Sequence, residues 1–490
     1  MTSPNLADQV AARIVPLLPT NSSILIGLSG GVDSVVLLHL LHQLAPRFSW
    51  QLSALHVHHG ISQNADAWAE FCSNLCAKYH ISLHVEYVDI SPLRAHGIEA
   101  AARKLRHAAF AGQVCDFVAL AHHADDQVET LLLQLLRGAG VRGASAMPVL
   151  SCVEGPAPSL MESLAIRLSC LETPAKSLVK PKRLLHSERD GSQNLLRPLL
   201  NCSRQGILDY AEAHGLQWIE DESNADESYP RNFLRHRLLP LLEEKFPAYR
   251  DTLTRSTQHF AEASELLDDL ARLDAQPTSP LPSGVWVGEK GKGHDATLEV
   301  SRLQSLPRHR AKNLLRYFLH SDGAPLPQAV QLDEMLHQLC SARADAAVCI
   351  DYGGWQVRRY RDRVYVMRAL GDFDRNLILP WHGEARLDWH ALNSSLVFAH
   401  TQGEGVSLAK LQHAPVTIRL RCGGELLRPH QNAATRTLKN LLQESCIPPW
   451  QRDRLPLLYC GNELVCVHGV AVAAEYQAAP EEAGIQLVTG

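Results

Sequence analysis

The chain has 490 residues, of which 46% are hydrophobic and 20% are charged, and its formal net charge is −5. This composition is typical of a soluble globular protein with roughly two to four domains. It excludes a globally basic nucleic-acid-binding protein, so any polyanionic partner has to meet local basic patches.

The sequence shows no sign of membrane insertion or secretion. Its longest apolar run, near Val35 to Leu41, is too short to span a bilayer, and residues 1–9 lack a signal-peptide pattern. The 12 cysteines include no C-x-x-C pair, which is typical of scattered thiols in a reducing compartment. We therefore expect a cytoplasmic protein that makes no membrane contact.

A glycine-rich turn joins the first strong strand pattern, residues 24–28, to the first strong helix pattern, residues 35–41. The turn reads Ser29-Gly30-Gly31-Val32-Asp33-Ser34. Backbone N–H groups at a helix N-terminus favour an anion such as phosphate, and the glycines allow its close approach. An ordinary turn capped by Asp33 and Ser34 is the alternative, but it would not need two glycines between serines. The turn is not a Walker A loop, because no Gly-Lys-Ser/Thr sequence closes it.

Alternating strand and helix patterns continue over the first 150 residues. The expected strands cover residues 52–57, 83–88 and 117–121, and the expected helices cover residues 65–79, 99–115 and 124–137. This alternation predicts an α/β fold with a doubly wound parallel sheet, Rossmann-like in its topology. Ligands of such folds bind beyond the carboxyl ends of the strands.

Polar residues gather at those expected strand ends. They are His56, His58, His59, Asp89, His122, His123, Asp125 and Asp126. A satisfied turn can hold one or two such residues. Polar ends on several neighbouring strands, together with the glycine-rich turn, indicate a binding site at this edge of the sheet.

The pattern changes after residue 150. Residues 151–194 are rich in proline and lysine, and we expect a long, partly ordered insertion. A helix is expected from Ser203 to His214. Pro230 suits the first turn of another helix, in which Arg231 and Arg235 lie on one face. That face meets solvent or contacts phosphate, and the spacing does not decide between the two.

The remaining chain is expected to be helical over residues 240–270, a linker over residues 276–293, a smaller mixed unit up to residue 370, and a β-rich unit over residues 375–490. Basic residues of the last unit lie near an aromatic residue, which is compatible with RNA contact. They are Arg419, Arg421, Arg428, Lys439, Arg452 and Arg454.

The glycine-rich turn resembles the PP-loop of the ATP pyrophosphatases, which cleave ATP to AMP and pyrophosphate. Further motifs extend this resemblance over most of the chain, to the tRNA(Ile)-lysidine synthetase family. They are residues 121–130 (AHHADDQVET), 137–140 (RGAG), 197–200 (RPLL), 220–237, 423–425 (GGE) and 448–450 (PPW). The last two indicate the longer form of the family, with two C-terminal domains. The insertion at residues 151–194 departs from the family's pattern.

The resemblance implies a ligation that modifies the wobble cytidine in the CAU anticodon of tRNA(Ile). ATP adenylates the C2 oxygen of the base, and the ε-amine of free L-lysine then displaces AMP to form lysidine. The implied domains are a catalytic domain at residues 1–230, a helical and mixed substrate-binding domain at residues 231–370, and a tRNA-binding domain at residues 375–490.

The matched motifs also imply roles for individual residues. ATP phosphates would bind the turn residues Ser29, Gly30, Gly31, Val32, Asp33 and Ser34, and Asp33 would hold Mg²⁺. The other implied catalytic positions are Arg103, His122, Asp126, Glu129 and Arg197, of which the arginines would contact phosphate, a base or the tRNA. Contacts to the anticodon stem would come from Arg231, Arg235 and Arg237.

The carboxylates Asp126 and Glu129 share a helix face, and either recognise lysine or take its proton. A carboxylate beside the ε-ammonium raises its pKa above about 10.4 and preserves the unreactive form, so we expect at least one of them to bind the α-amino group.

Two other functions stay open on the sequence. A related PP-loop enzyme that thiolates tRNA would need catalytic or cluster-binding cysteines, and the site region has no C-x-x-C pair. A non-enzymatic ATP-binding sensor would bind ATP without releasing pyrophosphate. The sequence also leaves a homodimer open.

Overall fold

The computed structural model describes residues 5–60, 62–89, 98–153, 193–222, 226–276, 297–343, 346–389 and 394–489. The chain packs as two units, Met1–Leu266 and Leu267–Gly490. The expected division into three domains stays a prediction. Most of the expected insertion at residues 151–194, and almost all of the expected linker at residues 276–293, lie outside the described residues.

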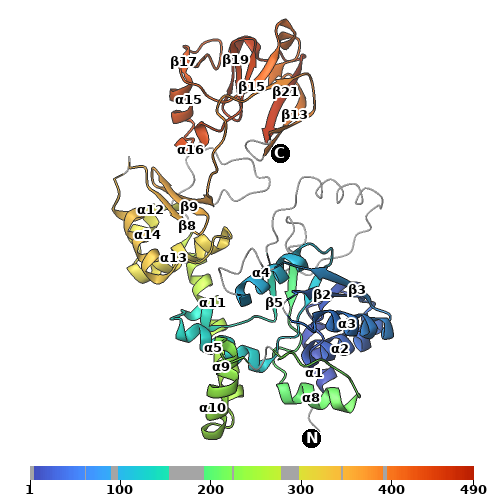
Figure 1. The fold of residues 1–490 in the computed structure, drawn as a ribbon. Coiled ribbons are helices and arrows are strands. Elements are labelled where there is room, and N and C mark those ends of the chain that lie inside the picture. The colour runs from blue at the N-terminus through green and yellow to red at the C-terminus, as the bar shows by residue number, and fades with distance from the viewer. Residues whose placement is uncertain are drawn as a thin grey trace. The chain divides into compact units, whose positions relative to one another are not determined.

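A six-stranded sheet in the order β3-β2-β1-β4-β6-β5 forms the centre of the first unit (Figure 1). Its strands are β1 (Ser23–Gly27), β2 (Gln51–His58), β3 (Ser82–Tyr87), β4 (Phe117–Ala119), β5 (Leu150–Val153) and β6 (Gln193–Leu196). All neighbours pair in parallel except β5, which runs antiparallel to β6 at the edge. The predicted doubly wound parallel sheet is confirmed, and the order reverses between β1 and β4.

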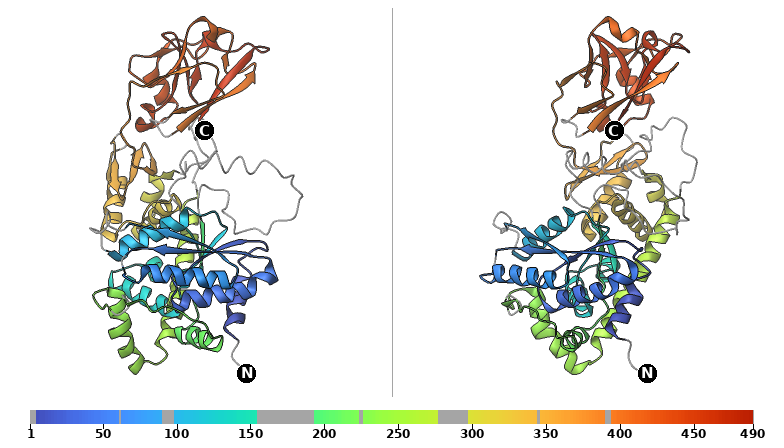
Figure 2. Two further views of the ribbon diagram at one scale, coloured as in Figure 1. Left: turned by 45° about the vertical axis from the view of Figure 1, so that its right-hand side comes forward. Right: turned by 90° about the vertical axis from the view of Figure 1, so that its right-hand side faces the viewer.

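Helices cover both faces of this sheet (Figures 1 and 2). The helices are α1 (Leu6–Ile14), α2 (Val32–Phe48), α3 (Ala65–Lys78), α8 (Arg204–Ala213) and, on the opposite face, α4 (Ile98–Ala111). Alternate residues of β1 point to opposite faces, as a strand requires. Ile24 and Ile26 belong to the core with α1, α2 and α8, whereas Leu25 packs with Phe110 of α4.

The helices that follow β4, together with those that follow α8, form a smaller cluster. They are α5 (Ala124–Leu136), α6 (Val141–Ala144), α9 (Pro230–Phe233), the π-turn η3 (Leu234–Leu238), α10 (Leu239–Lys245) and α11 (Tyr249–Asp274). Val128 of α5 is fully buried against Leu239 and Tyr249. The expected helical stretch over residues 240–270 is present as α10 and α11, and the chain turns between them at residues 246–248, where Pro247 cannot donate a helical hydrogen bond.

The second unit first pairs three helices with a small sheet. These elements are α12 (Val300–Ser305), α13 (Arg308–Ser321), α14 (Ala329–Ser341), β7 (Leu298–Glu299), β8 (Cys349–Tyr352), β9 (Trp355–Tyr360) and β10 (Arg363–Arg368). Strands β9 and β10 pair in antiparallel as a hairpin. Leu315 and Val357 lie in the core between the helices and the sheet.

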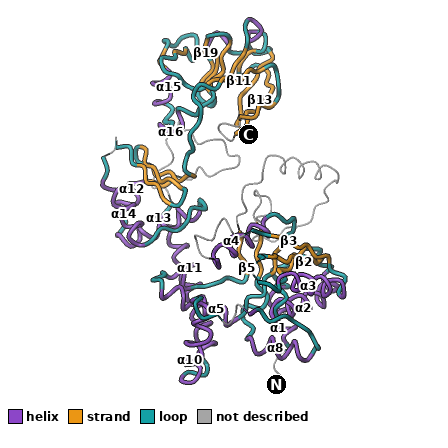
Figure 3. The backbone as a smooth tube through the Cα atoms, viewed as in Figure 1, coloured by secondary structure: helices purple, strands orange, loops and turns teal. Residues whose placement is uncertain are grey.

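The last part of the chain is rich in strands, shown orange in Figure 3, as the sequence predicts. One sheet contains β11 (Ile378–Trp381), β15 (Val416–Arg419), β18 (Leu457–Cys460), β19 (Glu463–Val467) and β20 (Ala471–Val472). A second contains β12 (Arg386–Trp389), β13 (Ser394–Gln402), β14 (Val406–Ser407) and β21 (Ala483–Thr489). Trp381 of the first sheet stacks on Phe398 of the second, with ring centroids 4.8 Å apart. Short elements complete this part: β16 (Leu426–Leu427), β17 (Arg436–Thr437), α15 (Leu438–Glu444) and α16 (Pro449–Arg452).

Within the described ranges, no helix is both long and apolar enough to cross a membrane.

Candidate functional site

The glycine-rich turn, residues 29–34, connects β1 to α2. The Ser34 hydroxyl accepts hydrogen bonds from the backbone N–H groups of Ser29 (3.2 Å) and Gly30 (3.1 Å), and donates one to the Gly31 carbonyl (2.9 Å). Helix α2 begins after Gly31, which has no side chain to cap it. The N–H groups of Val32, Asp33 and Ser34, which precede the first helical hydrogen bond from Val35 to the Gly31 carbonyl, therefore remain free to bind an anion.

Gly30 is required at its position. Its φ is +91°, and a Cβ atom there would lie 2.8 Å from the Cδ1 atom of Ile219. The Ile219 N–H also donates to the Gly30 carbonyl at 2.9 Å. The segment that follows α8 thus lies directly against the turn and fixes its backbone.

His123 is the centre of a buried ionic cluster beside the turn. Its Nε2 atom lies 3.7 Å from Asp33 and 3.5 Å from Asp126, and its Nδ1 atom lies 3.6 Å from Asp125. Burial alone would lower the pKa of His123, but the three carboxylates together raise it above the ordinary value. The imidazolium form is therefore favoured here.

Asp33 lies at the start of α2, where the sequence places it, and has one unsatisfied oxygen. Its Oδ1 atom is buried without a hydrogen-bond partner among the described residues. Burial raises the pKa of Asp33, partly opposed by His123. A carboxylate with a buried, unpaired oxygen gains from a bound cation.

The sequence singled out His122 and missed the role of His123. Burial lowers the pKa of His122 to about 3, so its ring is neutral near pH 7. Its Nδ1 atom is also buried without a partner in the described part of the chain. Both histidines follow β4, and only the fold distinguishes which of them faces the carboxylates.

Glu129 is fully buried and paired with two arginines. Its Oε2 atom accepts from Arg231 Nε at 2.8 Å, and its Oε1 atom accepts from Arg235 Nε at 2.8 Å. A third bond, from Arg235 Nη2 to Oε2, measures 3.1 Å. The sequence left open whether the face formed by Arg231 and Arg235 meets solvent or contacts phosphate. In the structure both side chains bind a buried carboxylate, and 24% of each side chain stays exposed.

Asp126 closes the cluster at the start of α5. Its Oδ2 atom accepts the backbone N–H of His123 at 3.0 Å. Its Oδ1 atom lies 3.9 Å from Arg231 and 3.7 Å from Arg235, beyond hydrogen-bonding distance. This oxygen keeps lone pairs free for a ligand.

Asp125 belongs to the same cluster through a residue that the sequence did not indicate. Arg250, at the start of α11, donates from Nε to Asp125 Oδ1 at 2.5 Å, and its other nitrogens bind Glu243 of α10. The backbone N–H of Arg204 donates to Asp125 Oδ2 at 3.2 Å. These partners hold the pKa of Asp125 well below its usual range despite its burial.

Arg197 and Arg103 lie at the same edge of the sheet. Arg197 follows β6, is 7% exposed, and donates to the Pro148 carbonyl (2.8 Å) and the Ser151 hydroxyl (3.2 Å). Burial and the charge of Arg103 lower its pKa to about 10. Its Nε atom has no partner within the described residues, whereas Arg103 on α4 is exposed.

Arg237, Arg452 and Lys439 are further basic residues that the sequence relates to tRNA or RNA contact. Arg237 forms an exposed ion pair with Glu227. Arg452 donates to the Ile447 carbonyl at 2.8 Å and to the Tyr360 hydroxyl at 2.9 Å, so it supports the local structure. Lys439 is exposed on α15.

Several unsatisfied polar atoms converge at the carboxyl edge of the sheet. Buried atoms without a partner in the described ranges include Asp33 Oδ1, His59 Nδ1, His122 Nδ1 and Arg197 Nε. Because buried polar atoms in folded proteins are normally paired, these atoms are suited to bind a polar ligand or ordered water. No preassembled group of three or more metal-binding side chains is found in the same ranges. Mg²⁺ typically takes one or two carboxylates together with phosphate oxygens and water, which suits Asp33.

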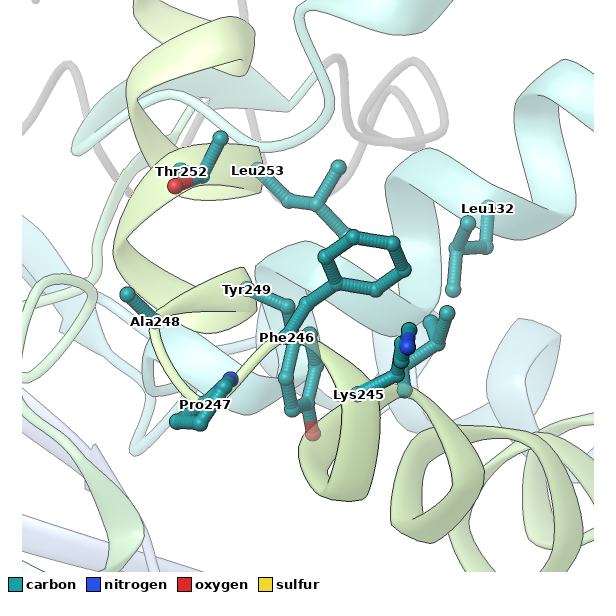
Figure 4. A pocket seen from close by; sticks show the side chains of 9 residues that line it. Leu132, Lys245, Phe246, Pro247, Ala248, Tyr249, Thr252 and Leu253 are labelled. Atoms are coloured by element: carbon teal, nitrogen blue, oxygen red, sulfur yellow. The ribbon is translucent and has the colours of Figure 1, made fainter.

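A separate apolar pocket of about 540 Å³ lies between α5 and the turn from α10 to α11 (Figure 4). Its lining residues are Leu132, Leu242, Lys245, Phe246, Pro247, Ala248, Tyr249, Thr252 and Leu253. None of the polar cluster residues around His123 lines it.

Comparisons with known proteins agree with this geometry. Family models match a PP-loop domain at residues 3–242, a TilS substrate binding domain at residues 298–365 and a TilS substrate C-terminal domain at residues 416–489. A tRNA(Ile)-lysidine synthase of Nitrosomonas europaea is 39% identical, over 94% of this chain and 90% of that protein. Enzymes of the same name from Aromatoleum aromaticum (37% identical, 98% and 99% covered) and Coxiella burnetii (34% identical, 96% and 94% covered) are also similar.

Proposed function

Because the chain belongs to the tRNA(Ile)-lysidine synthase family, we propose that it joins L-lysine to C2 of the wobble cytidine of tRNA(Ile), with cleavage of ATP to AMP and pyrophosphate. The observation that carries this proposal is the convergence of the free N–H groups of α2, the orphaned Asp33 oxygen and the buried basic groups at one edge of the sheet.

In the first step, the N–H groups of Val32, Asp33 and Ser34 bind the ATP phosphates, and the helix dipole of α2 stabilises their charge. The C2 oxygen of cytidine attacks the α-phosphorus, and pyrophosphate leaves. Arg197 donates its unpaired Nε–H to phosphate, and Arg103 lies close enough to Arg197 to lower its pKa. Adenylation is needed because the oxygen on C2 is otherwise a poor leaving group.

The charge balance of the site supports a requirement for Mg²⁺. The carboxylates of the cluster already face cations of the chain: Glu129 faces two arginines, Asp125 faces Arg250, and Asp33 faces His123. A triphosphate adds negative charge that these pairs do not balance. Mg²⁺ bound at Asp33 Oδ1 would supply positive charge where pyrophosphate departs.

In the second step, the ε-amine of lysine attacks C2, loses a proton, and AMP leaves with the oxygen. The free Oδ1 atom of Asp126 is suited to bind the α-ammonium group of lysine. Glu129 is less suited, because both of its oxygens are bonded to arginines. We therefore assign lysine recognition to Asp126, and the placement of Arg231 and Arg235 to Glu129.

tRNA is held by charge at more than one place. Phosphate contacts next to the site come from the exposed parts of the Arg231 and Arg235 side chains and from the exposed Arg237. In the last part of the chain, Lys439 is exposed and suited to the same task. A reaction that consumes ATP and tRNA supports the proposal of a cytoplasmic location, and a homodimer stays a prediction.

Incubation of the protein with tRNA(Ile), ATP and labelled lysine tests the proposal. We expect label in acid-precipitable RNA, with AMP and pyrophosphate as the other products. Pyrophosphate release without lysine transfer would indicate a different nucleophile, such as the sulfur of a thiolation enzyme. Binding of ATP without pyrophosphate release would indicate a sensor.

A further inference from the structure

We propose that Arg250 and Glu243, on the hairpin of α10 and α11, position Asp33 of the glycine-rich turn through Asp125 and His123. Neither hairpin residue belongs to the turn or to the motifs around residues 121–130. They are positioning residues, because the contacts that link them to Asp33 pass through two other side chains.

The contacts form one continuous chain. Glu243 accepts two hydrogen bonds from Arg250, from Nη1 at 2.6 Å and from Nη2 at 3.1 Å. The remaining nitrogen, Nε, donates to Asp125 at 2.5 Å. Asp125 lies 3.6 Å from His123 Nδ1, and His123 Nε2 lies 3.7 Å from Asp33.

This chain decides which way His123 points. The ring is 3% exposed and has carboxylates on both sides, with Asp125 at Nδ1 and with Asp33 and Asp126 at Nε2. Arg250 neutralises Asp125 and holds it on the Nδ1 side. Without Arg250, Asp125 loses its guanidinium partner in a site where its side chain is only 12% exposed, and it draws His123 away from Asp33.

The hairpin depends on this polar link because its apolar packing against α5 is incomplete. The pocket of about 540 Å³ opens between Leu132 of α5 and the hairpin residues Phe246 and Leu253 (Figure 4). Arg250 also lies over the ring of Tyr249, 4.7 Å from its centroid, which fixes the guanidinium beside Asp125.

The test uses the full chain and rests on the proposed function, so wild-type lysine transfer is measured first. We expect Arg250→Ala to lower kcat by about 10- to 100-fold, since a displacement of about 1 Å at a reacting group costs up to about 10²-fold. The number of sites that bind a non-hydrolysable ATP analogue per chain stays unchanged. Arg250→Lys recovers only part of the lost kcat, because a single ammonium group cannot bind the carboxylates of Asp125 and Glu243 at the same time. Arg255→Ala removes an exposed charge from the same helix, and its kcat stays within twofold of wild type.

A double-mutant cycle with Asp125→Asn separates positioning from loss of folding. If Arg250 acts through Asp125, adding Arg250→Ala to Asp125→Asn lowers kcat by less than threefold. Additive losses overturn the proposal, as does a fall in the number of nucleotide sites with kcat per site unchanged. If wild type transfers no lysine, the proposed function fails instead, and the two failures are thereby distinguished.

Discussion

Replacing Glu129 by glutamine is expected to destabilise the junction between α5 and α9. The carboxylate is fully buried, and three N–H···O bonds of 2.8, 2.8 and 3.1 Å join it to Arg231 and Arg235. Glutamine keeps the shape of the Glu129 side chain but loses its negative charge. Its amide NH₂ group is a hydrogen-bond donor and would face the N–H donors of a guanidinium.

Breaking a buried pair by changing one partner costs about 3–5 kcal/mol. The arginines keep 24% exposure, so water screens part of the loss and the lower value of about 3 kcal/mol applies. Against a total stability of about 5–15 kcal/mol, this loss is large but still permits folding.

Hydrogen exchange measures this effect locally, which suits a chain of two units. Backbone amides of residues 124–136 and 230–245 should exchange about a hundredfold faster in Glu129→Gln than in wild type, because 1.36 kcal/mol corresponds to a factor of ten. Glu227→Gln breaks the exposed pair with Arg237 and serves as the matched control, with almost no change expected. Equal exchange in Glu129→Gln and wild type would refute the assignment of a structural role to this carboxylate.

Three further outcomes are expected. Asp33→Asn should sharply reduce formation of both AMP and pyrophosphate, and ADP with phosphate as the coupled products would contradict the assignment of the turn. Lys439→Ala should lower the slope of log tRNA affinity against log salt by about 0.7–0.9, and an unchanged slope would argue against a phosphate contact at this residue. Arg452→Ala should instead lower the melting temperature of the second unit. Burial lowers the pKa of His59 to about 4. Between about pH 6.5 and pH 4 the unfolded chain therefore binds a proton that the folded chain does not, and the free energy of unfolding falls as the pH falls through this window. Urea titrations should show a smaller fall for His59→Gln than for wild type, and an identical pH profile would exclude this contribution.

Much of the first unit could be predicted because its elements are local and strongly patterned. The strand before the glycine-rich turn and the helix at residues 124–136 were expected within one residue of their observed bounds, whereas the helix after the turn, expected at residues 35–41, covers Val32–Phe48. Strands β5 and β6 were missed. Each has four residues, and they flank the long insertion, so no neighbouring pattern marks them.

The site was predictable as a location, because parallel strands bring their carboxyl ends together. Its internal pairing was not predictable. The bond between Arg250 and Asp125 joins residues 125 positions apart, and no spacing rule signals it. Likewise, neighbouring residues such as His122 and His123 cannot be told apart until the direction of their side chains is known.

The π-turn at Leu234–Leu238 explains how one short segment serves two partners that lie out of phase with each other. Arg231 before this turn and Arg235 within it both reach Glu129, and after it Leu239 packs against Val128 and Tyr249. A regular α-helix advances 100° per residue, so deleting one residue here would swing every later side chain by about that angle. A shortened segment could then keep its arginine pair or its leucine contact, but not both. Length at this point of the chain is therefore constrained as tightly as residue identity, and single-residue deletions should be tolerated far less well here than conservative substitutions.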